Sequence, residues 1–405
     1  MYFKSNEKSD CCGCGACSNV CPKHAIVMQE DECGFKYPVI NKELCVNCGL
    51  CEKSCIFSKK VLDNSYEAKY YAVCNKDTSI VKASSSGGML SLMAEEIFSR
   101  NGVVYGVVYG EGFRVEHKRA QNMNEAEAFR TSKYVQSDTT DLFEAVKNDL
   151  LDEKFVLVTG TPCQIAGIKE YLATSRIDTD KLYTCDNICH GVSSPLAFSD
   201  YLTFLNKYIP EGDSISYFNM RHKNEKTSTT VLEVKTEKGG SMPEIKDFSY
   251  YRLFLNRIAN RPSCFECRFT SYNRIGDLSV ADFWNGKVSD FKFDTSHGVN
   301  EVLVNSPKGR ELFDAICKNA YYQEVSKEKA WQPHLEYATQ KPKNYDQFWT
   351  EYLSSDDREQ IMRKYLKPSP LFKVINFATP ILRKTGLYTL FGRLYKTVFV
   401  SGGKR

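Results

Sequence analysis

The chain has 405 residues, of which 42% are apolar and 26% charged, and its formal net charge is +4 at pH 7. This length and apolar content predict two or three domains with hydrophobic cores. The sequence contains no uninterrupted apolar stretch of the roughly 20 residues that a membrane-spanning helix needs.

Eight of the seventeen cysteines form two runs of identical spacing near the N-terminus. The runs are Cys11-x2-Cys14-x2-Cys17-x3-Cys21, followed by Pro22, and Cys45-x2-Cys48-x2-Cys51-x3-Cys55. This is the ligand pattern of a pair of 4Fe-4S clusters, in which the fourth cysteine of each run binds the other cluster. We therefore predict one cluster on Cys11, Cys14, Cys17 and Cys55, and one on Cys45, Cys48, Cys51 and Cys21. A zinc module or a disulfide framework is the alternative, but zinc does not explain two runs of four.

Beyond these runs the pattern changes to short β-rich segments that alternate with helical ones. We expect strands over 70–73, 103–109, 155–158, 277–283 and 301–304, and helices over 88–99 and 162–173. A hairpin is expected over 231–242, with its turn at Lys238-Gly239-Gly240. The predicted fold class is α+β or mixed α/β, with a ferredoxin-like two-cluster module ahead of a larger mixed α/β region. The predicted domains are 1–60, 66–178, 179–345 and 346–405, and residues 59–65 are expected to link the first two.

The expected strand over 155–158 runs into Gly160-Thr161-Pro162-Cys163-Gln164, and a helix follows. A strand, loop and helix in this order present a loop and a helix N-terminus to a ligand.

The last part of the chain has its own charge balance. After Glu359 there are ten basic residues and no acidic ones, interleaved with apolar residues at roughly helical spacing. Such a segment is typical of interfacial amphipathic helices, which makes peripheral contact with the inner membrane surface one reading of it. Docking on the protein's own body or on a partner is the alternative. Since no basic and apolar leader precedes Cys11, we expect a cytoplasmic protein.

Five strings downstream of the cysteine runs resemble, in this order, the family of beta subunits of coenzyme F420 (deazaflavin) hydrogenases and dehydrogenases. They are Ser84-Ser85-Ser86-Gly87-Gly88, Ser132-Lys133-Tyr134-Val135-Gln136-Ser137, Gly160-Thr161-Pro162-Cys163-Gln164, Cys189-His190-Gly191-Val192 with Ser194-Pro195, and Cys264-x2-Cys267 leading to Gly276-Asp277 and Asp282-Phe283-Trp284. The resemblance covers roughly residues 8 to 310. It implies an iron-sulfur flavoprotein that carries FAD beside its clusters, so that the larger region binds the flavin.

Under this resemblance, the strings supply a flavin site. Its expected cofactor-binding residues are Ser84, Ser85, Ser86, Gly87, Gly88, Lys133, Tyr134, Gln164 and Asp282. The Ser-Gly run could hold a diphosphate or the ring edge, and Lys133 could place a cation near the flavin pyrimidine. Without the resemblance, the same residues are a plain helix cap, a solvated lysine inside a strand-like run, and an acid beside packing aromatics.

The strings also contain four further cysteines, for which we predict a third 4Fe-4S cluster. These are Cys163, Cys189, Cys264 and Cys267, with Cys185 as a possible substitute for Cys189. A structural zinc, or a CxxC pair with two unrelated thiols, is the alternative. The remaining cysteines, Cys12, Cys33, Cys74 and Cys317, lack the context of ligands. His190, next to Cys189, is a candidate catalytic residue that relays a proton, or it makes a fixed hydrogen bond instead. Lys133 is the second candidate catalytic residue.

The leading hypothesis is an oxidoreductase that takes electrons from a ferredoxin-like donor through its clusters to FAD and on to a two-electron, small-molecule substrate. From bacterial members of the family we expect a link to surface-polysaccharide synthesis. A second hypothesis is an electron-transfer subunit whose catalysis belongs to a partner chain. A third is a ferredoxin module joined to a binding protein that has lost its flavin. The expected partner is a redox protein or partner subunit, and no nucleic acid is expected.

Overall fold

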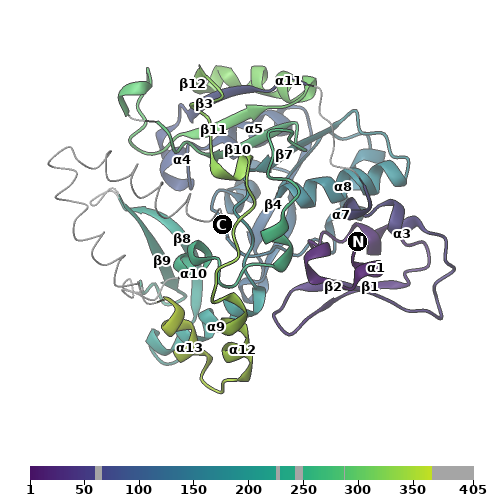
Figure 1. Ribbon diagram of the computed structural model, residues 1–405. Helices are drawn as coiled ribbons and strands as arrows, with labels where there is room; N and C mark the ends of the chain where they lie inside the picture. Colours follow the sequence, from purple (N-terminus) through teal and green to yellow (C-terminus); the bar gives the residue numbers. More distant parts are fainter. Residues whose placement is uncertain (60–65, 225–228, 242–249, 287, 367–405) are drawn as a thin grey trace.

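A mixed eight-stranded sheet forms the centre of the main body (Figure 1). The computed structural model describes residues 1–59, 66–224, 229–241, 250–286 and 288–366. The order in the sheet is β12-β3-β11-β10-β7-β6-β4-β5, and β4, β6, β7 and β10 run parallel to one another. The strands are β3 (Lys69–Asn75), β4 (Val103–Tyr109), β5 (Val115–Ala120), β6 (Val156–Gly160), β7 (Leu182–Asn187), β10 (Leu278–Asp282), β11 (Asn300–Val304) and β12 (Ala320–Val325).

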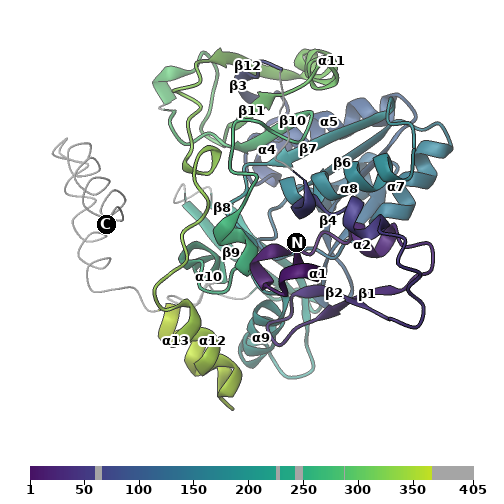
Figure 2. The same cartoon turned by 45° about the vertical axis from the view of Figure 1, so that its right-hand side comes forward.

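Helices cover both faces of this sheet, which explains why its central strands read as continuous apolar runs. One face is covered by α5 (Met89–Ser99) and α11 (Pro307–Ile316), and the other by α7 (Leu142–Leu151) and α8 (Pro162–Thr174), as Figure 2 shows. The short helices α4 (Thr78–Ala83) and α6 (Met123–Ala126) lie at the ends of β3 and β5. The predicted fold class, the five predicted strands and both predicted helices are confirmed. The sheet draws strands from both predicted regions, 66–178 and 179–345, and the boundary between them stays a prediction.

The expected hairpin over 231–242 has its turn where the sequence places it, since Gly239 N donates to Thr236 O and Thr236 N donates to Gly240 O, each at 2.9 Å. β8 (Ile215–Asn224) and β9 (Thr229–Thr236) form an antiparallel pair joined through residues 225–228. The turn at Gly239 and Gly240 is followed by an antiparallel bridge between Lys235 and Ser241, and Met242, the last residue of the expected hairpin, lies outside the described residues. The alternation in β8 is broken by two register shifts, between Ile215 and Tyr217 and between Asn219 and His222. These irregularities hide the strand in the sequence.

A second layer of packing gathers helices below the sheet around an aromatic core. It contains α9 (Pro195–Leu205), α10 (Tyr250–Asn256), α12 (Tyr345–Ser354) and α13 (Arg358–Leu366) together with the β8–β9 pair. Phe35 and Tyr37 of the N-terminal module also enter this core. The predicted region 346–405 therefore begins inside α12, while the predicted basic tail from residue 367 onward lies outside the described residues.

The N-terminal module is a β-hairpin flanked by short helices, and it packs against α7 and α8. Its elements are α1 (Tyr2–Ser5), α2 (Ala16–Asn19), β1 (Ile26–Glu30), β2 (Lys36–Ile40) and α3 (Leu50–Lys53). The hairpin pairs Ile26 with Ile40 and Glu30 with Lys36. The predicted linker 59–65 lies, after Lys59, outside the described residues.

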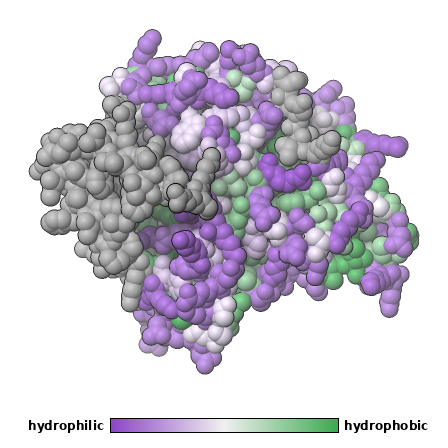
Figure 3. Space-filling view, viewed as in Figure 1, coloured by the Kyte–Doolittle hydropathy of each residue, from purple (hydrophilic) through white to green (hydrophobic). Residues whose placement is uncertain are grey.

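The surface of this module carries exposed apolar side chains, which Figure 3 shows as green areas on its right-hand side. Val27 and Val39 face each other across the hairpin, and Leu44 and Val46 flank Cys45; their exposed fractions are 57%, 47%, 50% and 58%. No helix within the described ranges, the module included, combines the length and the hydropathy required to cross a membrane.

Candidate functional site

The first predicted ligand set, Cys11, Cys14, Cys17 and Cys55, comes together beside α2 and α3. Burial raises the pKa of the Cys17 thiol, and the neighbouring thiols of Cys14, Cys11 and Cys55 raise it further. The loop that carries the set turns at Gly13, whose φ is +69°, and its backbone N–H donates to the Cys11 sulfur at 3.4 Å. A loop of this shape directs several cysteine side chains to one point.

Helix α8 lies directly against this first set. A Cβ atom on Gly167, in the middle of α8, would lie 2.9 Å from the Cys14 sulfur. Three side chains of the main body also hold carbonyl groups of the cysteine loop. Arg261 donates to Cys11 O at 2.8 Å, Gln136 to Cys12 O at 2.8 Å, and Thr139 to Cys14 O at 2.9 Å. The first set is therefore the inner one, at the interface of the module with the main body.

The second predicted set, Cys45, Cys48, Cys51 and Cys21, lies on the outer side of the module. Cys48 is exposed, and the other three are half-buried. The thiols of Cys51 and Cys48 act on each other electrostatically, and the Cys21 sulfur accepts a hydrogen bond from Ala25 N at 3.3 Å. The charge of the Cys51 thiol also raises the pKa of Cys17 in the first set, so the two sets are neighbours.

The four cysteines of the predicted third set converge on one small cavity. Cys163 is in the first turn of α8, Cys189 follows β7, and Cys264 and Cys267 belong to the short 3-10 helix Pro262–Glu266 and its end. All four line the cavity. Burial raises the pKa of the Cys189 thiol well above its usual range, and the charges of Cys264, Cys163 and Cys267 raise it further. Cys185 does not belong here, because it is buried in β7 and lines a different cleft.

The thiols of the third set lie farther apart than the ligands of a single bound zinc ion, and the third cluster stays a prediction. With Zn–S bonds of about 2.3 Å, tetrahedral ligand sulfurs lie about 3.8 Å apart. Within the described residues, the single trio of His, Cys, Asp or Glu ligand atoms closer than 4.8 Å to one another is Asp31, Glu32 and Cys33. No three thiols of the first or third set approach each other that closely. All seventeen cysteines lie among the described residues, and all are free of disulfides.

Cys12 occupies a place that the sequence did not indicate. It is buried and lines the cavity of the third set, and the neighbouring thiols of Cys14 and Cys163, together with burial, raise its pKa well above the usual range. It therefore lies between a thiol of the first set and a thiol of the third. Cys33, Cys74 and Cys317 pack at the borders of apolar clusters, as expected.

A cleft of about 500 Å³ opens at the carboxyl ends of the parallel strands, where α/β sheets bind ligands. Thr159 and Gly160 of β6, Asp186 of β7 and Asp282 of β10 line it. Residues of all five strings that carry the family resemblance meet here, although they are far apart in the chain. Of the nine expected cofactor-binding residues, eight line the cleft: Ser84, Ser85, Ser86, Gly88, Lys133, Tyr134, Gln164 and Asp282. The ninth, Gly87, packs against β3 and β11 instead, with its Cβ position 2.6 Å from Val73 O.

The cleft and the third cysteine set share a wall. Cys189, His190, Gly191, Val192 and Thr161 line both cavities. A group held by the third set would therefore be separated from a ligand in the cleft by one layer of residues.

The Ser-Gly run is fixed mainly by bonds to its own surroundings. Ser84 and Ser86 donate to the carbonyls of Ile80 and Val299, while Ser85 Oγ accepts from Ser132 N at 2.9 Å and so joins two of the strings. Gly88, with φ +80°, is the N-cap of α5. The N-terminal end of an eleven-residue helix thus borders the cleft, where its partial positive charge favours an anion.

Lys133 differs from the expected solvated lysine in a strand. It is 5% exposed, in a loop whose next residue, Tyr134, has φ +49°. Its ammonium donates to the carbonyls of Ala128 and Thr131 at 2.6 and 2.7 Å. Burial lowers the pKa of Lys133 to about 7. A buried ammonium at the wall of a cleft is suited to an anionic ligand, which would hold the proton on it.

The remaining polar groups of the cleft are tied to one another. Asp282 pairs with Arg221 at 2.6 Å, and Arg221 also donates to the Tyr134 hydroxyl at 3.0 Å. Gln164 is buried and bonds with Thr161 and Ser137, which makes it a brace between two strings. Sequence reasoning missed Arg221, because it lies in the irregular strand β8 and in none of the strings.

His190 lies in an aromatic group at the wall between the two cavities. Its ring centroid is 4.2 Å from that of His334 and 4.8 Å from that of Trp284, which is half exposed. Burial lowers the pKa of His190 to about 3, and the neighbouring His334 and Arg221 lower it further. The imidazole is therefore neutral near pH 7.

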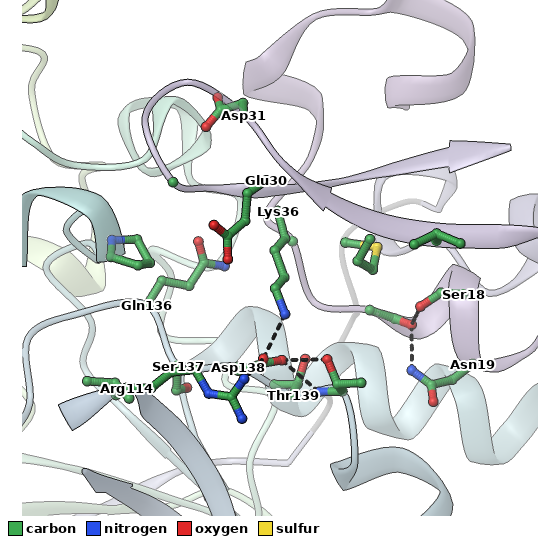
Figure 4. A pocket seen from close by; sticks show the side chains of 18 of the residues that line it. Ser18, Asn19, Glu30, Asp31, Lys36, Arg114, Gln136, Ser137, Asp138 and Thr139 are labelled. Carbon is green, nitrogen blue, oxygen red and sulfur yellow. Dashed lines mark hydrogen bonds and ion pairs between the residues drawn. The ribbon is translucent and has the colours of Figure 1, made fainter. Parts of the chain in front are cut away.

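A larger groove of about 1230 Å³ runs between the module and the main body (Figure 4). Lys36 of β2 crosses it and pairs with Asp138 at 2.7 Å. The groove is lined by Cys21 and by the hairpin, but it contains residues of only two of the five strings. The smaller cleft at the sheet edge, where all the strings meet, is the better candidate for a cofactor site.

Comparisons with known proteins agree with this arrangement. Residues 153–330 match the family described as the C terminus of the beta subunit of coenzyme F420 hydrogenase/dehydrogenase, and residues 10–58 match "4Fe-4S dicluster domain". The chain is 23% identical over 351 residues to the F subunit of the F(420)H(2) dehydrogenase of Methanosarcina mazei, which covers 78% of this chain and 93% of that protein. It is 41% identical over 49 residues to an uncharacterized ferredoxin of Methanocaldococcus jannaschii, covering 12% of this chain and 62% of that one.

A solved structure is also similar, at 16% identity and a TM-score of 0.41 over 75% of this chain and 94% of the other. It is titled as a xenon derivative of the F420-reducing [NiFe] hydrogenase complex from Methanosarcina barkeri. The two family matches include both cysteine runs and three of the five strings, those at 160–164, at 189–195 and from Cys264 onward. Residues 153–330 thus match the C terminus of the beta subunit of coenzyme F420 hydrogenase/dehydrogenase, and a 4Fe-4S dicluster domain precedes them, which makes the chain an iron-sulfur protein similar to these oxidoreductases.

Proposed function

We propose that this protein is an iron-sulfur flavoprotein oxidoreductase that passes electrons from a redox partner, through three 4Fe-4S sites, to FAD in the cleft at the sheet edge. The observation that carries the proposal is the unbroken row of sites. The charge of Cys51 in the outer set acts on Cys17 of the inner set, Cys12 lies beside both Cys14 and Cys163, and Cys189 lines both the third cavity and the cleft. When bound, clusters exchange single electrons and a flavin combines two such exchanges into hydride transfer.

The chain's own residues supply the binding groups for this row. The inner and outer sets would each give four thiolates, and the third set four more. Gly13 and the tight packing of Gly167 fix the inner loop. His190 and Thr161 form the wall that separates the third set from the cleft.

In the cleft, the N-terminus of α5 and Lys133 provide positive charge for the anionic parts of FAD. Lys133 would keep its proton at Nζ beside an anionic ring and would so favour the reduced flavin. His190, neutral near pH 7 and packed against Trp284, would orient the ring or the substrate. Its role in proton relay stays a prediction.

The substrate is a small molecule that takes up two electrons in the open part of the cleft, near Trp284. The relative from Methanosarcina mazei is named as a subunit of an F420H2 dehydrogenase, and this supports a second candidate function. In that case the chain would deliver electrons to or from a partner subunit that carries the catalysis. A link to surface-polysaccharide synthesis stays a prediction from the family resemblance.

Cofactor analysis after anaerobic purification tests the proposal. We expect about twelve irons and twelve sulfides per chain for three clusters, and about eight for two, together with one FAD released on denaturation. Cys264→Ser is expected to lower the iron content by roughly four, because it removes one of four ligands of the third set. Cys185→Ser is the matched control: it removes a buried thiol of β7 that lines the cleft, and should leave iron unchanged. Zinc in the wild type with unchanged iron in Cys264→Ser would contradict a third cluster.

Turnover by the isolated chain distinguishes the two candidate functions. Given a low-potential donor, an enzyme reduces a small-molecule acceptor, whereas an electron-transfer subunit reduces dyes only. If the protein binds no flavin after anaerobic purification, it is not a flavoprotein oxidoreductase.

A further inference from the structure

Arg261 is a fully buried arginine between the inner and the third cysteine sets. Its exposed fraction is 0%. The guanidinium donates to Cys11 O at 2.8 Å, to Lys36 O at 2.9 Å and to Gln136 Oε1 at 2.8 Å. All three acceptors are neutral groups. Over the described residues, no carboxylate forms an ion pair with Arg261.

Among the described residues, Arg274 is also deeply buried, and its surroundings show the kind of partner that Arg261 does not have. Arg274 pairs with the equally buried Asp186 at 2.6 Å. Burying a charge without a partner costs several kcal/mol, and arginine cannot lose its proton in a protein. The rings of Tyr37 and Phe35, at 4.2 and 5.3 Å from the guanidinium carbon, offset only a small part of this cost. Arg261 therefore requires a buried anion that the carboxylates of the described chain do not supply.

The groups on which the Arg261 charge acts are cysteines of both sets. They include Cys11 and Cys14 of the inner set, Cys163 and Cys264 of the third set, and Cys12 between them. Metal-bound cysteines are thiolates. The missing anion is thus the combined negative charge of the two cysteine-bound sites on either side of the guanidinium.

We propose that Arg261 is a positioning residue whose fixed charge raises the reduction potentials of the inner and third clusters above that of the outer one. This inference rests on the proposed function. A cluster gains one negative charge when it accepts one electron, so a nearby cation stabilises its reduced form. The outer set is partly exposed to solvent, where water screens such a charge. Electrons that arrive at the outer set would then move inward along a favourable gradient.

Potentiometric titration followed by EPR tests this assignment in the full-length, anaerobically purified protein. Arg261→Gln removes the charge and keeps a hydrogen-bond donor. We expect the reduction equilibrium of the inner and third clusters to become about tenfold less favourable, which is a negative shift of about 59 mV for a one-electron step. The signal of the outer cluster should not move and serves as the internal control. Arg261→Lys keeps the charge and should shift the potentials much less.

A second variant covers the case in which Arg261→Gln loses iron. Gln136→Glu places a carboxylate beside the guanidinium, so that the charge is cancelled while Arg261 stays in place. Because this change also removes the amide that donates to Cys12 O, Gln136→Met, which removes the same donor without adding a charge, is its control and should leave the potentials unchanged. Gln136→Glu should produce the same negative shift with a full iron content. Equal potentials in wild type, Gln136→Glu and any iron-loaded Arg261→Gln would overturn the inference, as would an equal shift in Arg261→Lys. If wild type holds only eight irons, the third cluster of the proposed function fails, yet the shift of the inner cluster is still expected.

Discussion

Lys133 combines burial with a position at the wall of the cleft, and this makes the stability of the flavin-free protein depend on pH. Its pKa of about 7 in the folded chain lies below the value of 10.5 for an exposed lysine. Between these values the unfolded chain holds the proton and the folded chain does not, so the contribution of Lys133 to stability rises with pH through this window. Below pH 7 both states are protonated, and the buried charge destabilises the fold fully.

We therefore expect Lys133→Met to stabilise the flavin-free protein at pH 6.5, and the gain to shrink steadily as the pH rises toward 10. Anaerobic urea unfolding, followed by tryptophan fluorescence at several pH values, measures this difference. Lys42→Met, at an exposed position of the module, is the control and should show no such trend. A constant difference between Lys133→Met and wild type across the window would contradict the burial argument.

Single residues were predictable from the sequence where their chemistry forces a spacing. The eight N-terminal cysteines and the convergence of Cys163, Cys189, Cys264 and Cys267 followed from ligand patterns and from the family strings. Cys12 and Arg261 were missed, because their roles depend on which loops meet in space. The one sequence signal for Arg261 is its place three residues before Cys264, and this alone does not indicate burial.

At the scale of elements, helix α8 links the sheet to the inner cysteine set through Gly167. Glycine within a helix ordinarily destabilises it by about 1 kcal/mol relative to alanine. Here a methyl group would lie 2.9 Å from both the Cβ and the sulfur of Cys14, where there is no room for it. We predict that Gly167→Ala displaces the inner loop and lowers the iron content by about four per chain, with loss of the inner cluster's EPR signal.

A change of helix propensity alone should have no such effect. Ala173→Gly, at an exposed position of the same helix, costs about 1 kcal/mol of helix stability and is expected to keep all of its iron. Full iron content in Gly167→Ala would show that the module can move away from α8 without losing its cluster.

Elements with an uninterrupted pattern of apolar residues could be predicted from the sequence, and elements in which this pattern is interrupted could not. The sheet strands β3, β4, β6 and β11 are almost continuously buried, so their apolar runs identified them. Strand β8, which pairs with β9, was missed because two register shifts interrupt it. The order of strands in the sheet, and hence the meeting of five distant strings at one edge, depends on long-range pairing that no local pattern encodes.

At the scale of the whole molecule, the row of sites runs from an exposed end to a buried one. The outer set lies in a module whose surface exposes Val27, Val39, Leu44 and Val46, while the third set and the cleft lie inside the main body. Exposed apolar side chains beside a redox site mark a surface where a partner protein docks. Electrons from a redox protein would therefore arrive at the module and leave at the cleft.

If electrons enter at the module, Val46→Glu should slow reduction by a protein donor but not reduction by a small reductant. A charge placed in an apolar contact must be desolvated, and a loss of about 1.4 kcal/mol in docking corresponds to a tenfold lower apparent affinity. With a small two-cluster ferredoxin as donor, we expect about tenfold slower reduction in stopped-flow experiments at subsaturating donor, and an unchanged rate with dithionite. Leu151→Glu, a substitution of equal exposure outside the module, should leave both rates unchanged. If Val46→Glu slows dithionite as well, the substitution disturbs the cluster itself, and if it slows neither, the donor docks elsewhere.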